Sequence, residues 1–100
     1  MNSVKIPRNQ FAKALKHARK LRLLSQEDFG LVSSRTYVST LERGLKSPTL
    51  SKIDELAAVL SLHPLTLLTL AYASRQNAGA EHELLTKVAQ ELAALQHSAS

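Results

Sequence analysis

The sequence predicts an all-α fold, and three observations support this. Apolar residues recur at intervals of three and four along most of the chain, which is the spacing of one buried face of an α-helix. Hydroxyl residues stand directly before several of these segments, where they can cap a helix N-terminus. No segment shows the strict alternation of apolar and polar residues that is typical of a half-buried strand.

Composition restricts the class of protein. The chain has 100 residues, 44% of them hydrophobic, and no cysteine. This length suits one domain with a modest core and is short for an enzyme with a deep, walled active site. Without cysteine, neither disulfides nor thiolate metal sites can hold the fold, and the chain suits a reducing compartment. We expect a cytoplasmic binding or regulatory module and no enzyme.

The N-terminus and the apolar segments give no sign of a membrane protein. The opening residues MNSVKIPRNQ carry basic side chains but no apolar block follows them, so they do not read as a secretory signal. The apolar run LHPLTLLTLAYA is interrupted by proline and threonine and is shorter than the roughly 20 residues that a membrane span needs. We therefore expect no membrane partner.

The charges are distributed unevenly. The net charge is +5, but residues 1–52 carry eleven basic and three acidic side chains, a net +8, whereas residues 53–100 have a net −3. A basic half beside a mildly acidic half indicates a polyanionic partner on one side of the molecule. The alternative is an ordinary solvated charged surface.

The first two helices follow from periodicity and capping. Asn9 to Leu24 forms the first segment, and Ser25 stands three residues before the Asp28 carboxylate, so a short second helix should run from Gln26 to about Leu31. The residues expected to face inward in the first helix are Phe11, Ala14, Leu15, Ala18 and Leu21.

Three further helices complete the core domain. Ser34 should cap a third helix that ends near Gly44, Thr49 should cap a fourth, and Pro64 should open a fifth that runs to about Ser74. The third helix should bury Val38, Leu41 and Leu45, and the fourth should bury Leu50, Ile53, Leu56, Ala57 and Leu60.

A sixth helix follows a break in the pattern. Residues 75–80, RQNAGA, read as a linker. Beyond them Leu85, Val88, Leu92 and Leu95 form a two-heptad apolar stripe, which must pack on the core domain or on a second copy. The predicted organisation is an N-terminal arm at 1–7, a core domain at 8–74, the linker at 75–80 and a C-terminal helix at 81–97.

One combination of motifs is made up of Ser25, Gln26, Tyr37, Val38, Ser39, Leu41, Glu42, Arg43, Gly44, Pro48, Thr49, Leu50, Leu56, Ala57 and Leu60. With these residues in place, the chain over residues 8–73 resembles the helix-turn-helix domain of the phage repressor and Cro family, the XRE-like regulators. The resemblance implies a five-helix lambda-repressor-like domain whose third helix enters the DNA major groove. It also implies a mostly buried ion pair between Arg19 and Glu42. Leu23 departs from the family pattern, which usually has a turn glycine at this place.

The residues of the third helix suit that role. With Val38 and Leu41 inward, the helical period places Arg35, Thr36, Ser39, Thr40 and Arg43 on the outer face. Arginine can bond a guanine edge with two donors, and threonine can donate, accept or contact a thymine methyl. The expected base contacts are Arg35, Thr36, Ser39 and Thr40. The expected phosphate contacts are Gln26, Ser34, Tyr37, Arg43, Lys46 and Lys16.

Two classes of function remain from the sequence. The first is a sequence-specific DNA-binding regulator, a homodimeric repressor that reads a palindromic operator and pairs through Leu85, Val88, Leu92 and Leu95. The alternative is a protein-interaction module or antitoxin-like co-regulator. We expect no cofactor and no metal, because His17, His63, His82 and His97 lack ligand spacing.

Overall fold

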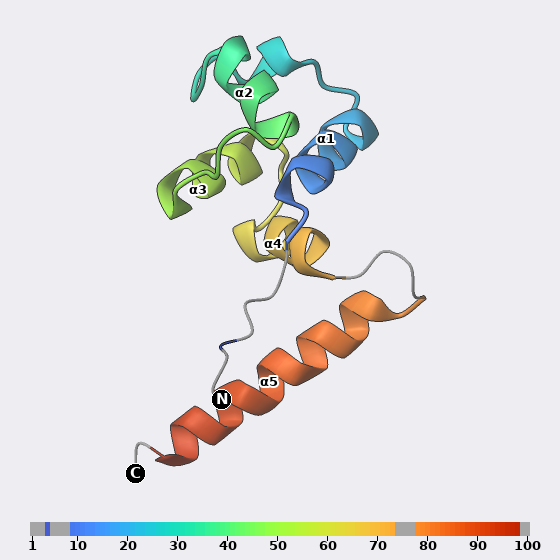
Figure 1. Ribbon diagram of the computed structural model, residues 1–100, viewed down its shortest axis with the longest axis vertical. Helices are drawn as coiled ribbons and strands as arrows, with labels where there is room; N and C mark the ends of the chain where they lie inside the picture. The colour runs from blue at the N-terminus through green and yellow to red at the C-terminus, as the bar shows by residue number, and fades with distance from the viewer. Residues whose placement is uncertain (1–3, 5–8, 74–77, 99–100) are drawn as a thin grey trace.

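The protein is all-helical in the part of the chain that the structure describes. The structure is a computed structural model that describes residues 4, 9–73 and 78–98. In Figure 1, helices α1 to α4 and η1 form one cluster, α4 lies between α1 and the long C-terminal helix α5, and no strand occurs among the described residues. The elements are α1 (Phe11–Leu21), the 3₁₀ helix η1 (Gln26–Phe29), α2 (Arg35–Glu42), α3 (Leu50–Val59), α4 (Pro64–Tyr72) and α5 (Ala80–Ser98).

Two of the helix starts are capped by the hydroxyl residues that the sequence indicates, Ser34 and Thr49. The Ser34 hydroxyl accepts a hydrogen bond from the Tyr37 N–H at 3.1 Å, and the Thr49 hydroxyl accepts one from the Lys52 N–H at 3.1 Å. His63 caps α4 through Nδ1, which accepts from the Leu65 N–H at 3.0 Å. These side chains satisfy backbone donors that the first turn of a helix leaves free.

Three helices end in the same left-handed turn. At the ends of α1, α2 and α3 the residue just beyond the cap has a positive φ: Leu23 at 58°, Gly44 at 73° and Ser61 at 57°. In each turn the next N–H donates back into the last helical turn, for example Leu24 to the Arg19 carbonyl at 3.0 Å. This is the Schellman motif, which favours glycine. Leu23 therefore adopts a left-handed conformation that favours glycine, with its side chain in solvent.

The core lies where the four cluster helices and η1 converge. Phe29 from η1 fills its centre and is fully buried, which fixes η1 against the rest of the domain. The apolar faces that the periodicity predicts for α1, α2 and α3 meet there, together with Leu67 of α4. The largest fully buried side chains are Phe29, Leu15, Leu41, Leu56, Leu60, Leu67 and Val38.

Three residues expected to face inward are exposed instead, so these predictions were wrong. Leu21, Leu45 and Leu50 are 69%, 64% and 74% exposed. Leu21 is the last residue of α1 and Leu50 the first residue of α3, so both lie at helix ends. Leu45 follows the Gly44 turn and has left the helical period.

Several helices are shorter than periodicity predicts. Helix α1 ends at Leu21 rather than Leu24, and α2 ends at Glu42 because Gly44 already turns left-handed. The second helix is a single 3₁₀ element, Gln26–Phe29. Helix α4 ends at Tyr72; Ser74 and residues 75–77 of the expected linker lie outside the described residues, and Ala80 already belongs to α5.

Helix α5 contacts α4 but leaves its apolar stripe uncovered. Ala80, at the start of α5, is buried. Leu85, Val88, Leu92 and Leu95 are exposed by 52%, 40%, 54% and 67%. The stripe is therefore not packed on the core domain, which was one of the two places where we expected it to pack. No single described helix is long and apolar enough to cross a membrane; α3 and α4 together reach that length but meet at a bend of 106°.

Candidate DNA-binding surface

Helix α2 is held firmly on its inner side. Val38 and Leu41 are fully buried in the core, and Ser34 caps the N-terminus. At the other end, Gly44 and Leu45 close the Schellman turn through N–H donors to the Leu41 and Thr40 carbonyls at 3.0 and 3.1 Å. The backbone of α2 is thus fixed at both ends and in the middle, which leaves only its outer side chains free to adapt to a ligand.

The outer face of α2 carries the four predicted base contacts. Arg35 and Thr36 are exposed in its first turn, and Ser39 and Thr40 are half-buried in the next. The Thr40 hydroxyl donates to the Thr36 carbonyl at 2.8 Å, so its proton is already used and its methyl group and oxygen lone pairs remain for a partner. The first turn is accordingly the more exposed part of this face.

An acidic residue that the sequence patterns do not single out stands beside this face. Glu27 of η1 places Oε1 3.4 Å from Nη1 of Arg35, and both side chains are exposed, by 71% and 68%. The pair joins η1 to the start of α2. No sequence pattern indicates it, because the two residues meet only when the turn between these helices folds.

The expected phosphate contacts divide into exposed and internally bonded side chains. Arg43, Lys46 and Lys16 are exposed, and the Arg43 Nε–H donates to the Ser39 carbonyl at 3.4 Å. Gln26 is half-buried and its Nε2 donates to Glu42 Oε1 at 3.2 Å. An amide nitrogen has two N–H groups, so this bond leaves Gln26 one further donor.

Tyr37 packs at the edge of the domain against Lys52, a residue that no sequence pattern indicates. The Lys52 ammonium lies 5.7 Å from the centre of the Tyr37 ring, a cation–π distance. The same nitrogen donates to the Val32 carbonyl at 2.5 Å and pairs with Glu55 at 2.9 Å. Lys52 thereby ties α3 to the turn before α2.

Arg19 and Glu42 form a two-point ion pair between α1 and the end of α2. Arg19 Nε donates to Glu42 Oε2 at 2.7 Å, and Nη2 donates to Oε1 at 2.9 Å. The side chains are only 11% and 4% exposed. Arg19 Nη1 also donates to the Leu24 carbonyl at 2.9 Å, which fixes the turn after α1.

The surroundings shift the pKa values of both partners toward the charged forms. Burial alone would raise the pKa of Glu42, but hydrogen bonds from Arg19 and Gln26 outweigh it and hold that pKa below its ordinary value. The hydrogen bond to Glu42 raises the pKa of Arg19 against the effect of burial. The pair is charged at neutral pH and locks the end of α2 to α1.

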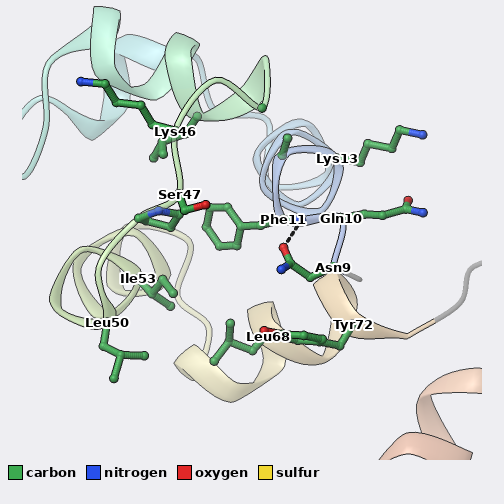
Figure 2. Close-up of a pocket in the computed structure, with 14 residues that line it drawn as sticks. Asn9, Gln10, Phe11, Lys13, Lys46, Ser47, Leu50, Ile53, Leu68 and Tyr72 are labelled. Atoms are coloured by element: carbon green, nitrogen blue, oxygen red, sulfur yellow. Dashed lines mark hydrogen bonds between the residues drawn. The ribbon is translucent and has the colours of Figure 1, made fainter. Parts of the chain in front are cut away.

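A groove of about 740 Å³ lies between α1, α3 and α4, beside the turn that follows α2. Figure 2 shows Phe11, Ile53 and Leu68 on its walls and Lys13 and Lys46 extending away from it. Asn9 closes one end, where its Oδ1 accepts from the Phe11 N–H at 3.2 Å. No group of three or more metal-ligating side chains occurs among the described residues.

The fold and this surface define a small helical DNA-binding module. A short helix is anchored by two apolar residues, presents arginine and threonine outward, and follows η1 after a tight turn, which is the arrangement of a helix-turn-helix. The basic half of the chain contains this unit.

Comparison with known proteins gives the family. Residues 15–67 match the profile of the helix-turn-helix family, and the chain belongs to this family, in its XRE-like branch. The fold is also similar to the crystal structure of the restriction-modification controller protein C.AhdI from Aeromonas hydrophila. The two are 33% identical with a TM-score of 0.55, over 58% of this chain and 91% of that chain. No curated protein matches the sequence. The protein is a DNA-binding regulator of the helix-turn-helix class.

Proposed function

We propose that this protein is a transcriptional repressor that binds a palindromic operator as a homodimer and reads base edges with α2. The observation that carries the proposal is the exposed first turn of α2, where Arg35 and Thr36 project from a helix whose backbone is fixed. Arginine with free donors is the side chain best suited to a guanine edge in the major groove. Such a protein works in the cytoplasm, on the nucleoid when it is bound to DNA.

The remaining contacts fall into two groups: base contacts, which add sequence preference, and phosphate contacts, which add affinity. Ser39 and Thr40 lie one turn after Arg35 and Thr36 and would contact neighbouring bases. The basic side chains expected at the phosphates, Arg43, Lys46 and Lys16, gain affinity by displacing condensed counterions, an effect that is independent of sequence and weakens with salt. The neutral side chains expected there, Gln26, Ser34 and Tyr37, would donate hydrogen bonds that fix the position of the protein on the duplex.

Selection of bound sites from a random DNA pool tests the proposal directly. The selected duplex should contain two inverted half-sites whose centres are about 34 to 36 Å apart. Arg35→Ala should then cost about 1 to 3 kcal/mol on this duplex and relax the preference at one base pair in each half-site. A pool without an enriched sequence would refute sequence-specific binding.

Lys46 provides the matched control, because it follows α2 and is expected to reach only the sugar-phosphate backbone of the DNA. Lys46→Ala should weaken binding equally on preferred and scrambled duplexes and make the slope of log affinity against log salt shallower by about one unit. Binding of both variants should be measured on both duplexes at two salt concentrations. If Arg35→Ala lowers affinity equally on both duplexes, Arg35 contacts a phosphate and is not a base reader.

The exposed stripe on α5 supports dimerisation through Leu85, Val88, Leu92 and Leu95, since a two-fold protein suits a palindromic site. Leu92→Glu in the full chain should shift the sedimentation coefficient from dimer to monomer and weaken operator binding. Gln90→Glu adds the same charge to another part of the α5 surface and should leave both unchanged. A Leu92→Glu protein that remains dimeric would show that α5 does not form the dimer.

The same stripe supports a second candidate, an antitoxin-like co-regulator that binds another protein through α5. In that case Leu92→Glu leaves the oligomeric state and operator affinity unchanged and abolishes binding of the partner protein. The sedimentation experiment therefore separates the two functions.

A further inference from the structure

The carboxylate of Glu27 occupies an unusual place for a DNA-binding surface. The basic half of the chain has three acidic residues. Asp28 accepts the Ser25 N–H at 2.6 Å and so caps η1, and Glu42 is buried with Arg19. Glu27 neither caps a helix nor forms a buried pair, since it is 71% exposed and its Oε1 lies 3.4 Å from Arg35 Nη1. An exposed carboxylate close to phosphates weakens DNA binding by repulsion. Its presence on this surface therefore calls for a compensating role.

The geometry of the guanidinium suggests that role. The group has five N–H donors in a rigid planar fork. A carboxylate at Nη1 leaves the edge formed by Nε and Nη2, which offers two parallel donors, the pattern that guanine O6 and N7 accept. Glu27 thus engages one part of the Arg35 fork and leaves a complete two-donor edge unused.

The elements that carry the pair also fix where it points. Glu27 is on η1, which is anchored by the buried ring of Phe29 and capped through Asp28. Arg35 is the first residue of α2, the other half of the helix-turn-helix. A contact between these two rigid elements restricts a side chain that would otherwise sample many rotamers in solvent.

We propose that Glu27 is a positioning residue that orients Arg35 for base reading. The inference rests on the proposed function, because it takes Arg35 as the base reader. In water an exposed pair contributes little to folding stability. In the major groove the surrounding water is displaced and the contact strengthens, so Glu27 acts on specificity and not on the fold.

The test is a double-mutant cycle on DNA binding with Glu27→Ala, Arg35→Ala and the double variant. Each protein is titrated with the preferred duplex and with a duplex changed at the base pair to which Arg35→Ala is sensitive. Glu27→Ala should reduce discrimination between them by about tenfold, within the range that one bidentate contact supplies. Glu27→Gln keeps an acceptor oxygen and should retain more discrimination than the alanine variant. In the Arg35→Ala background, Glu27→Ala should change discrimination by less than about twofold.

Asp54→Ala is the charge-matched control, because Asp54 is an exposed carboxylate on α3. It should change affinity for both duplexes by the same factor. If Glu27→Ala raises affinity equally on both duplexes, as a simple loss of repulsion would, the positioning role is overturned while Arg35 remains the reader. If Arg35→Ala affects all duplexes equally, the assignment of Arg35 fails and the inference falls with it.

Discussion

Replacement of Glu42 by alanine should destabilise the fold strongly. The variant removes the acceptor of two hydrogen bonds from Arg19 and one from Gln26. The Arg19 side chain is only 11% exposed, so its charge would be left without a partner in a place that water barely reaches. Breaking a buried pair in this way costs about 3 to 5 kcal/mol. For a domain of this size each kcal/mol lowers the melting temperature by about 4 to 8 °C.

Urea denaturation followed by circular dichroism measures the loss. Glu55→Ala is the control: Glu55 also pairs with a basic residue, Lys52 at 2.9 Å, but is 48% exposed, and its loss should cost at most about 1 kcal/mol. The apolar double variant Arg19→Met, Glu42→Leu should be more stable than Glu42→Ala, because it buries no unpaired charge. A Glu42→Ala protein that melts within a degree or two of the wild type would refute the argument.

Two further outcomes follow from the same structure. Because the pKa of Glu42 is lowered in the folded state, the stability advantage of the wild type over Glu42→Gln should be complete above the ordinary glutamate pKa of about 4.3 and should shrink as the pH falls below it. An advantage that grows on acidification, in urea titrations at several pH values, would contradict this sign. Leu23→Gly should raise stability by about 0.5 to 1 kcal/mol, because Leu23 has φ 58° and is 91% exposed. Thermal melts should show no such gain for Leu31→Gly, since Leu31 is also exposed but lacks a positive φ.

Local features of the fold could be predicted from the sequence. Ser34 and Thr49 accept hydrogen bonds from N–H groups three residues away, so the residues that determine these caps are close together in the sequence. Periodicity failed at helix ends: it assigned Leu45 and Leu50 to the core, although one follows a turn and the other begins a helix. A repeat pattern does not show where the helix that carries it stops.

Contacts between elements could be predicted only in part. The pairing of Arg19 with Glu42, 23 positions apart, was implied by the family resemblance and not by spacing. Glu27 and Lys52 were missed because their partners, Arg35, Tyr37 and the Val32 carbonyl, approach them only through the turn between η1 and α2. That turn decides which side chains surround the start of α2. Its path depends on how the helices pack together and not on a local sequence pattern.

The buried pair and the candidate DNA-binding surface are connected through Gln26. Its amide donates to Glu42 Oε1 at 3.2 Å, and its second N–H is the donor that we expect to reach a phosphate. The bond to Glu42 therefore fixes the direction of a side chain that would otherwise be mobile at the protein surface. Because Glu42 is at the last position of α2 and Arg19 holds it to α1, the expected phosphate contact and α2 share one rigid support. Glu42→Gln should consequently weaken operator binding at temperatures well below its melting point, whereas a pair that only stabilises the fold would leave the affinity of the folded protein unchanged.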